Sequence, residues 1–210
     1  ALRCTLRHAT SKLHQEEDLF AVQTLGFRGE ALSSIAAVSE MSITTKRPGE
    51  VEAFRVLLKG GQIVSSSIAA ADSGTSMEVK NLFYNTPARK KFLKTDSVEL
   101  GHIVDTVLNY ALINPHVAFK LSHEGHELLS SPAVQDFRSN IASLYGVSVA
   151  KEMLEVNHQA NDIMIYGFIG KPYHARNDKS QQAIFVNRRW VKNEDILKAI
   201  YDAYHSLLFV

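Results

Sequence analysis

The sequence lacks the features that mark several protein classes. It contains one cysteine, Cys4, which excludes a disulfide within the chain and fits a reducing compartment. No apolar run approaches the ~18 residues that a membrane-spanning helix needs. Arg3, Arg7 and His8 in the first ten residues argue against a secretory signal. Hydrophobic residues make up 45% and charged residues 21% of the 210, which excludes a disordered or collagen-like chain.

Charge of one sign is not in excess either. The chain has 23 Lys and Arg against 22 Asp and Glu, for a net charge of +1. Neither part on the two sides of Ser131 is strongly basic, so any nucleic-acid binding must use local patches. Two such patches stand out, one at Arg89, Lys90, Lys91 and Lys94 and one at Arg188, Arg189 and Lys192. The alternative interpretation of each patch is a solvated face of a helix or strand.

Hydrophobic periodicity predicts a mixed α+β protein, long enough for one large domain or two small ones. A linker is expected at residues 130–132, where Ser-Ser-Pro interrupts the pattern. The chain opens within a predicted helical turn and closes on an apolar run at 207–210, so we expect a fragment of a longer protein. Helices are predicted at residues 18–23, 29–39, 96–112, 135–145 and 193–206, and strands at 41–46, 51–58, 62–70, 74–80, 117–122, 126–130, 153–157, 163–169 and 183–186.

The most informative segment is GFRGEAL at residues 26–32. Two glycines three apart lead directly into a helix, and glycine lets backbone N–H groups approach a ligand closely. The first turn of a helix adds N–H donors without acceptors and a partial positive charge, which together favour a phosphate. Taken alone, the same pattern also fits an ordinary turn followed by a helix cap. Glu30 is interpreted as a residue of the helix start rather than as a general base.

Four motifs in order resemble the MutL family of DNA mismatch-repair ATPases, most of all its bacterial members. They are RHATSK at 7–12, GFRGEAL at 26–32, a Gly-Thr pair at 74–75 leading to LFYNTPARKKFLK at 82–94, and VNRR at 186–189. The resemblance covers essentially the whole chain. It implies the later part of a GHKL-type ATPase sandwich at residues 1–131, followed at 132–210 by a ribosomal-protein-like transducer domain truncated at its C-terminus.

The resemblance also implies ATP as the ligand of the glycine segment. It implies a threonine near the adenine at Thr75 and a lysine beside the phosphates at Lys12. The nucleotide-binding residues expected on this basis are Thr10, Ser11, Lys12, Gly26, Phe27, Arg28, Gly29, Glu30, Ala31, Leu32 and Thr75. Thr75 can equally be an ordinary strand residue and Lys12 a surface lysine.

No catalytic residue and no metal ligand is assigned within this chain. The family's general-base glutamate, its Mg²⁺-binding asparagine and its adenine-reading Asp-x-Gly element precede the matched region, and its γ-phosphate lysine follows it. We therefore expect an ATPase in the parent protein, with Mg²⁺ held elsewhere, and no measurable turnover by these 210 residues alone, since a general base is worth ~10²–10⁴-fold.

For partners, the resemblance implies sequence-independent DNA binding, an ATP-dependent homodimer, a MutS-type mismatch recognition protein and a downstream nuclease or helicase. It implies a bacterial cytoplasmic, nucleoid-associated location and no membrane partner. The residues expected to contact DNA phosphates are Arg89, Lys90, Lys91, Lys94, Arg189 and Lys192. ATP binding would gate dimerisation, DNA binding and the coupling of mismatch recognition to nicking and excision.

Two other functions share some of these sequence features. A non-enzymatic DNA-binding module with remnant ATPase motifs is the alternative, and the sequence that precedes this chain in its parent would separate the two. A topoisomerase of the same fold is disfavoured by the motifs at 26–32 and 85–89. His123 and His126 flank a turn, but residues three apart on a hairpin are expected to face opposite sides, so no metal site is predicted there.

Overall fold

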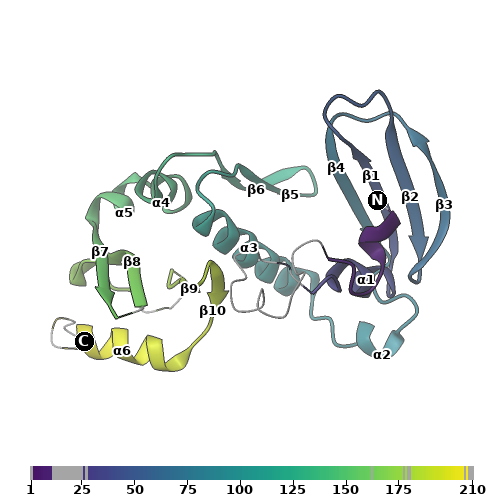
Figure 1. Cartoon of the computed structure of the whole chain (residues 1–210). Coiled ribbons are helices and arrows are strands. Elements are labelled where there is room, and N and C mark those ends of the chain that lie inside the picture. Colours follow the sequence, from purple (N-terminus) through teal and green to yellow (C-terminus); the bar gives the residue numbers. More distant parts are fainter. Residues whose placement is uncertain are drawn as a thin grey trace. The chain divides into compact units, whose positions relative to one another are not determined.

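A computed structural model describes residues 2–10, 26, 28–161, 163–176, 178, 181–205 and 207. Its contacts divide the chain into two compact units, Ala1–Thr95 and Asp96–Val210 (Figure 1). Within these described ranges, no helix combines the length and the apolarity that a bilayer crossing requires. The predicted helix at 18–23 and the site residues Ser11, Lys12 and Phe27 lie outside them.

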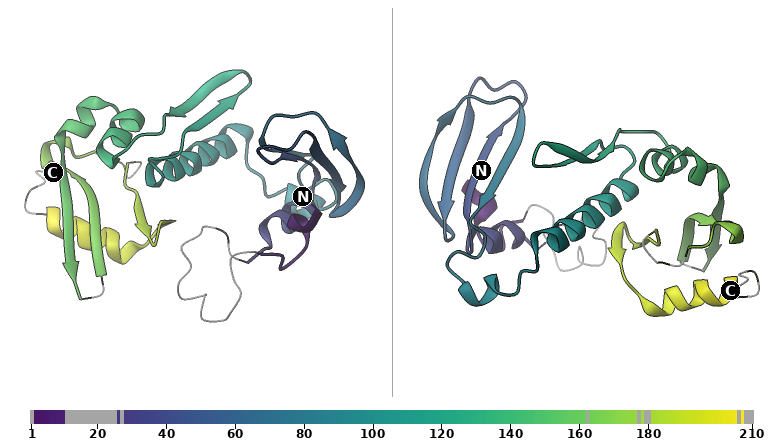
Figure 2. Two further views of the ribbon diagram at one scale, coloured as in Figure 1. Left: turned by 45° about the horizontal axis from the view of Figure 1, so that its top comes forward. Right: turned by 180° about the vertical axis from the view of Figure 1, so that it is seen from behind.

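The first unit is an antiparallel sheet with short helices at one end. The strands lie in the order β3-β2-β1-β4, and Figure 2 shows the sheet from two further sides. The elements are the 3₁₀ helix η1 (Leu2–Thr5), α1 (Ala31–Ala36), β1 (Glu40–Lys46), β2 (Ala53–Lys59), β3 (Gln62–Ala69), β4 (Gly74–Lys80) and α2 (Pro87–Lys90).

One face of β1 and β2 carries the core of this unit. Met41 and Ile43 alternate with more exposed residues, and the register sets them opposite Leu58 and Val56. Because side chains of a strand alternate between faces, all four lie on one side of the sheet. Ala36 of α1 completes this buried cluster, so the helix is held against the sheet by its last residue.

Helix α1 is shorter than the 29–39 prediction. It begins at Ala31 and ends at Ala36, and the chain then makes tighter turns, with Val38 N–H donating to the Ile35 carbonyl at 3.1 Å. The carbonyls of the next residues bind other segments instead of continuing the helix. The apolar periodicity extends past the helix because Val38 already belongs to the approach to β1.

The second unit combines one long helix with three two-stranded sheets. Helix α3 contacts both strands of β5–β6 and also α4, and α4 contacts α5. The elements are α3 (Asp96–Ile113), β5 (Phe119–His123), β6 (His126–Ser131), α4 (Phe137–Tyr145), α5 (Val147–Glu152), β7 (Met153–Ala160), β8 (Ile163–Gly170), the 3₁₀ helix η3 (Pro172–His174), β9 (Ile184–Val186), β10 (Arg189–Val191) and α6 (Glu194–Tyr204).

The segment at 130–132 is not a linker. Ser131 is the last residue of β6 and is 2% exposed, and its hydroxyl donates to Asn140 Oδ1 at 3.2 Å. The Asn140 amide in turn donates to the carbonyls of Ala111 and Leu112, both at 2.9 Å. This buried network ties α3, β6 and α4 together within the second compact unit.

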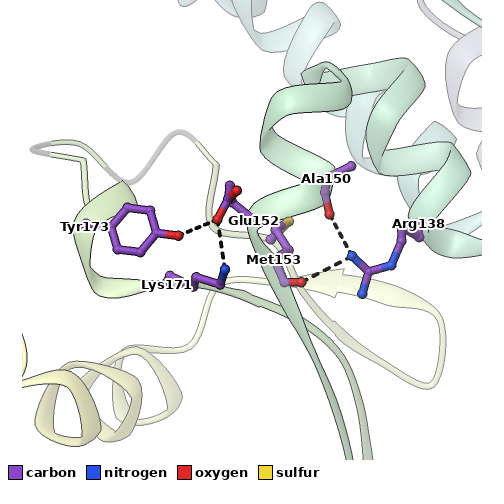
Figure 3. A network of polar contacts seen from close by, with 6 residues as sticks. All are labelled: Arg138, Ala150, Glu152, Met153, Lys171 and Tyr173. Atoms are coloured by element: carbon purple, nitrogen blue, oxygen red, sulfur yellow. Dashed lines mark hydrogen bonds and ion pairs between the residues drawn. The ribbon is translucent and has the colours of Figure 1, made fainter.

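A second polar network ties the end of α5 to η3 and to Lys171, the residue before η3 (Figure 3). Glu152, the last residue of α5, accepts hydrogen bonds from Lys171 Nζ at 2.9 Å and from the Tyr173 hydroxyl. Both bonds lower the pKa of the Glu152 carboxyl below its usual 4.5, the Tyr173 bond most. Arg138 of α4 donates to the carbonyls of Ala150 and Met153, at 2.8 and 3.2 Å. The junction between α4, α5 and β7 is therefore fixed by one guanidinium.

Two expectations about hairpins in this unit need correction. The hairpin β9–β10 around Asn187 and Arg188 contains a second strand that was not predicted. The expectation that His123 and His126 face opposite sides is wrong, because the register of β5–β6 makes them direct partners. Cross-strand partners share a face.

Candidate functional site

Gly29 is the residue at which the glycine segment meets the RHAT segment. Its φ of +64° lies in the left-handed region, and a Cβ there would lie 2.6 Å from both the carbonyl carbon and the oxygen of Ala9. No side chain fits at that separation, so glycine is required for two independent reasons. The two motifs, some twenty residues apart in sequence, therefore form one backbone-to-backbone contact.

His8 and Glu30 extend this contact. The His8 imidazole Nδ1 lies 3.1 Å from Glu30 Oε1, but the two side chains are 77% and 49% exposed, so the pair adds little stability. Glu30 is the N-cap residue of α1 and its side chain makes no cap hydrogen bond. Its carbonyl accepts from Ser34 N–H and from the Ser33 hydroxyl, both at 2.9 Å. Glu30 thus starts the helix, as its position predicted.

The first turn of α1 offers backbone donors. The N–H groups of Ala31 and Leu32 have no acceptor within the helix, as in any first turn. Among the described residues other than its chain neighbours, no atom lies within 4 Å of the position that a Cβ on Gly26 would take. Thr10 is half-buried and Arg28 is exposed. Uncharged N–H donors on a close-lying backbone suit an anion such as a phosphate.

Thr75 belongs to β4. It is opposite Thr45 on β1, and the two hydroxyl oxygens are 2.9 Å apart. The role of Thr75 near an adenine stays a prediction.

The basic segment after LFYNTP is anchored to the end of α1, which sequence reasoning missed. Phe83 N–H donates to the Val38 carbonyl at 2.7 Å, and the Asn85 amide donates to the Ala37 carbonyl at 2.9 Å. These bonds pin the loop that precedes α2 to the helix that follows the glycine segment. The sequence signal that could have indicated this anchor is Asn85, which lies between the aromatic stretch at 82–84 and the basic stretch at 89–94. A short amide side chain often binds the backbone in turns.

The four cations of this segment are all exposed, and one of them also contacts an aromatic ring. Arg89 stacks on Phe83, with its guanidinium carbon 4.8 Å from the ring centroid. Lys90, Lys91 and Lys94 are exposed, as Arg89 also is. Four exposed cations within six residues give a positive patch on the first unit.

The second basic group lies on the β9–β10 hairpin of the other unit. Arg189 is half-buried in β10, whereas Lys192 is exposed and its Nζ lies 4.9 Å from the centroid of the Trp190 ring. Arg188 occupies the turn with a φ of +65° and donates from Nη2 to Asn114 Oδ1 at 2.9 Å. Arg188, which is not among the residues expected to contact DNA phosphates, thereby holds the hairpin to the residue that follows α3.

Comparison with known proteins agrees with these motifs. The sequence model of a family described as DNA mismatch repair protein, C-terminal domain, matches residues 141–209. The DNA mismatch repair protein MutL of Geobacillus kaustophilus is 45% identical over 202 residues, which is 96% of this chain. The chain belongs to the MutL family.

The match covers part of its relatives only. The chain spans 32% of the length of the Geobacillus protein, so about a third of a full-length MutL. The family model covers the part that carries β7 to α6, including Arg189 and Lys192. The whole-length similarity to MutL proteins extends over the glycine segment and the basic segment of the first unit as well.

Solved structures of a MutL protein and of a DNA repair protein share the fold. The ATPase domain of Aquifex aeolicus MutL complexed with ADP superposes with a TM-score of 0.69 at 27% identity, over 90% of this chain and 71% of that one. The N-terminal domain of a DNA repair protein gives a TM-score of 0.76 at 29% identity, over 98% and 66%. The α+β class expected for this MutL region is confirmed.

Proposed function

We propose that this chain supplies the nucleotide lid, a basic DNA-facing segment and the transducer of a MutL-type mismatch-repair ATPase. Residues 1–131 would belong to the ATPase domain and 132–210 to the transducer. The family match at 141–209 supports the second assignment. The observation that carries the proposal is the Gly29–Ala9 contact, because it joins two motifs of the family into one backbone surface.

ATP would bind with its phosphates against the backbone of 26–32. The support is chemical: the first-turn N–H groups and the glycine backbone are donors without charge, which fit a polyphosphate, and a MutL relative was solved with ADP. Ser11, Lys12, Phe27 and Thr10 would complete the phosphate end and Thr75 the adenine end. Because phosphate contacts are made by the backbone, side-chain truncation at Leu32 should matter less than any Cβ at Gly29.

Within the described ranges, no group of three or more His, Cys, Asp or Glu side chains could hold a metal. The general base and the Mg²⁺ ligand of the family are not assigned to any residue of this chain. Mg²⁺ would supply charge compensation on the triphosphate when bound. The role of these residues is to bind and position the phosphates.

DNA would be bound through phosphates. Arg89, Lys90, Lys91 and Lys94 on the first unit, and Arg189 and Lys192 on the second, are the proposed contacts. The hydrogen bonds of Phe83 and Asn85 to the end of α1 give a route by which a nucleotide at the glycine segment could influence the first of these groups. ATP binding would gate homodimerisation, DNA binding and engagement of a MutS-type protein and a downstream nuclease or helicase.

The test separates nucleotide binding from hydrolysis. The parent protein should bind and hydrolyse ATP, and Gly29→Ala in the parent should weaken the binding of a non-hydrolysable ATP analogue. The 210-residue chain alone should show no turnover. Turnover by the isolated chain at the parent's rate would refute the assignment of the general base outside it. Unchanged analogue affinity in the Gly29→Ala parent would refute the phosphate site.

The alternative is a DNA-binding module that no longer binds ATP. It predicts a parent whose DNA affinity is the same with and without the ATP analogue. The ATPase proposal predicts that the analogue strengthens DNA binding, since it would promote the dimer.

A further inference from the structure

The hairpin β5–β6 ends in a turn that places two histidines side by side. Glu124 and Gly125 have φ values of +49° and +80°, the sign pattern of the two-residue turns that keep both strands in register. The register then sets His123 directly opposite His126. Both histidines are exposed at the tip of the hairpin.

The spacing suits a shared ligand. Directly opposed residues in an antiparallel pair have Cα atoms ~4.5–5.5 Å apart, with side chains on the same face. Two imidazoles at that separation can each place one nitrogen ~2.0–2.1 Å from a single ion between them. Preorganisation by the turn is what distinguishes this pair from two histidines that are merely close in sequence.

The charged neighbours do not crowd the ion position. Lys120 and Glu127 form an ion pair at 2.9 Å, and their register partners are Ser130 and Ser122. These residues alternate with the histidines, so they lie on the other face. The next pair on the histidine face is Leu121 with Leu129, which is apolar. Glu124 in the turn is the nearest carboxylate in sequence.

We propose that His123 and His126 form a two-imidazole binding site for a divalent cation of borderline softness, such as Zn²⁺, Ni²⁺ or Cu²⁺. Imidazole favours these ions, whereas Mg²⁺ and Ca²⁺ prefer oxygen ligands. Within the described part of the chain no third protein ligand joins them in a cluster. The remaining coordination positions are open to water or to a donor from a second molecule. A bound ion would cross-link β5 to β6.

The experiment is a titration of the tag-free 210-residue chain with NiCl₂ after removal of metals by a chelator. Calorimetry should detect one site that is weakened at least ~10-fold by either His123→Asn or His126→Asn. His158→Asn is the matched control, because His158 is also an exposed histidine of a hairpin but lies opposite Ile165. Saturating Ni²⁺ should raise the thermal unfolding midpoint of the wild type and of this control.

Equal Ni²⁺ affinities in the wild type and in the doubly substituted His123→Asn, His126→Asn chain would overturn the proposal, as would an equal loss in His158→Asn. A spectroscopic arm guards against effects of the substitutions on folding. Electron paramagnetic resonance of bound Cu²⁺ should show two imidazole nitrogens in the wild type and one in each single variant. One nitrogen in the wild type would also overturn the site.

Discussion

At the scale of single residues, Gly29 is the position where geometry leaves no choice of side chain. Gly29→Ala would place a methyl group 2.6 Å from the Ala9 backbone, in a conformation that already costs a non-glycine residue ~1–2 kcal/mol. The backbone must move to relieve the clash. We expect the contact between the glycine segment and the RHAT segment to open, lowering the thermal unfolding midpoint of the chain.

The control for this prediction is Gly49→Ala. Gly49 has a φ of +86°, but among the described residues other than its chain neighbours no atom lies within 4 Å of its Cβ position, so this variant reports the backbone conformation alone. Calorimetric unfolding of both variants compares the two effects. If Gly29→Ala lowers the thermal unfolding midpoint no more than Gly49→Ala does, the steric argument is wrong.

The sequence identified Gly29 but not its partner. Two glycines before a helix predict a special backbone at that place, because only glycine adopts positive φ without cost. Nothing in a sequence encodes which backbone lies against a glycine, since the contact involves no side chain of Ala9. A different limit applies to Arg188 and Asn114, because their side chains form a hydrogen bond across 74 positions of sequence that no local pattern reveals.

At the scale of secondary structure elements, Asn140 decides how α3, β6 and α4 pack. Its side chain is fully buried and makes hydrogen bonds to Ser131 and to two carbonyls at the end of α3. Asn140→Ala removes the amide donor from the Leu112 carbonyl and leaves the Ala111 carbonyl with the Asn114 N–H at 3.3 Å, at a cost of ~1–3 kcal/mol in the free energy of unfolding. Denaturant unfolding measures this loss.

Ser143→Ala provides the comparison on the same helix. The Ser143 hydroxyl donates to the Ser139 carbonyl at 3.0 Å in an exposed position, and exposed substitutions of this kind change stability by less than ~0.5 kcal/mol. Similar losses in the two variants would mean that the buried network does not hold the elements together.

The network around Glu152 predicts a pH dependence. The hydrogen bonds from Tyr173 and Lys171 lower the pKa of this carboxyl in the folded chain below its usual 4.5. A group with a depressed folded pKa stabilises the folded state above its ordinary pKa, and this contribution is lost as the pH falls through the folded value. The urea midpoint of the wild type should therefore be higher than that of Glu152→Gln at pH 6. The difference between the two midpoints should disappear toward pH 3.

Glu155 lies in β7, three residues after Glu152, and Glu155→Gln controls for the general effect of removing a carboxylate. A gap between wild type and Glu152→Gln that stays constant from pH 6 to pH 3 would show that the ionised carboxylate is not what stabilises the junction. The measurement is a urea titration at each pH, followed by circular dichroism.

Element prediction from the sequence succeeded where turn chemistry is explicit. The glycine pair at 60–61 and the Glu-Gly turn at 124–125 gave both hairpins. It failed at β10, because Asn187 and Arg188 adopt positive φ without glycine. It also failed at residues 130–132, because serine and proline suggest a loop while Ser131 is buried by a partner, Asn140, that no local pattern reveals.

At the scale of the whole molecule, the near-neutral net charge of +1 constrains the proposed binding of DNA. A nearly balanced protein gains no general attraction for the polyanion, so binding depends on the few cations placed at the interface. The two basic groups lie on different compact units. The resemblance to the MutL family predicts that both basic groups contact DNA. Composition alone favours the interpretation of each group as a solvated face of a helix or strand.

This dependence predicts the salt response of the parent protein. Each phosphate contact adds ~0.9 to the slope of log affinity against log salt concentration on duplex DNA. Lys94→Ala should therefore weaken DNA binding for all sequences alike and reduce the slope by about one unit. Lys198→Ala on α6, an exposed lysine outside both groups, should leave the slope unchanged. Fluorescence anisotropy at several salt concentrations gives both slopes. An unchanged slope in Lys94→Ala would exclude Lys94 as a phosphate contact, and an equal reduction in Lys198→Ala would mean that DNA senses the total charge of the protein rather than these patches.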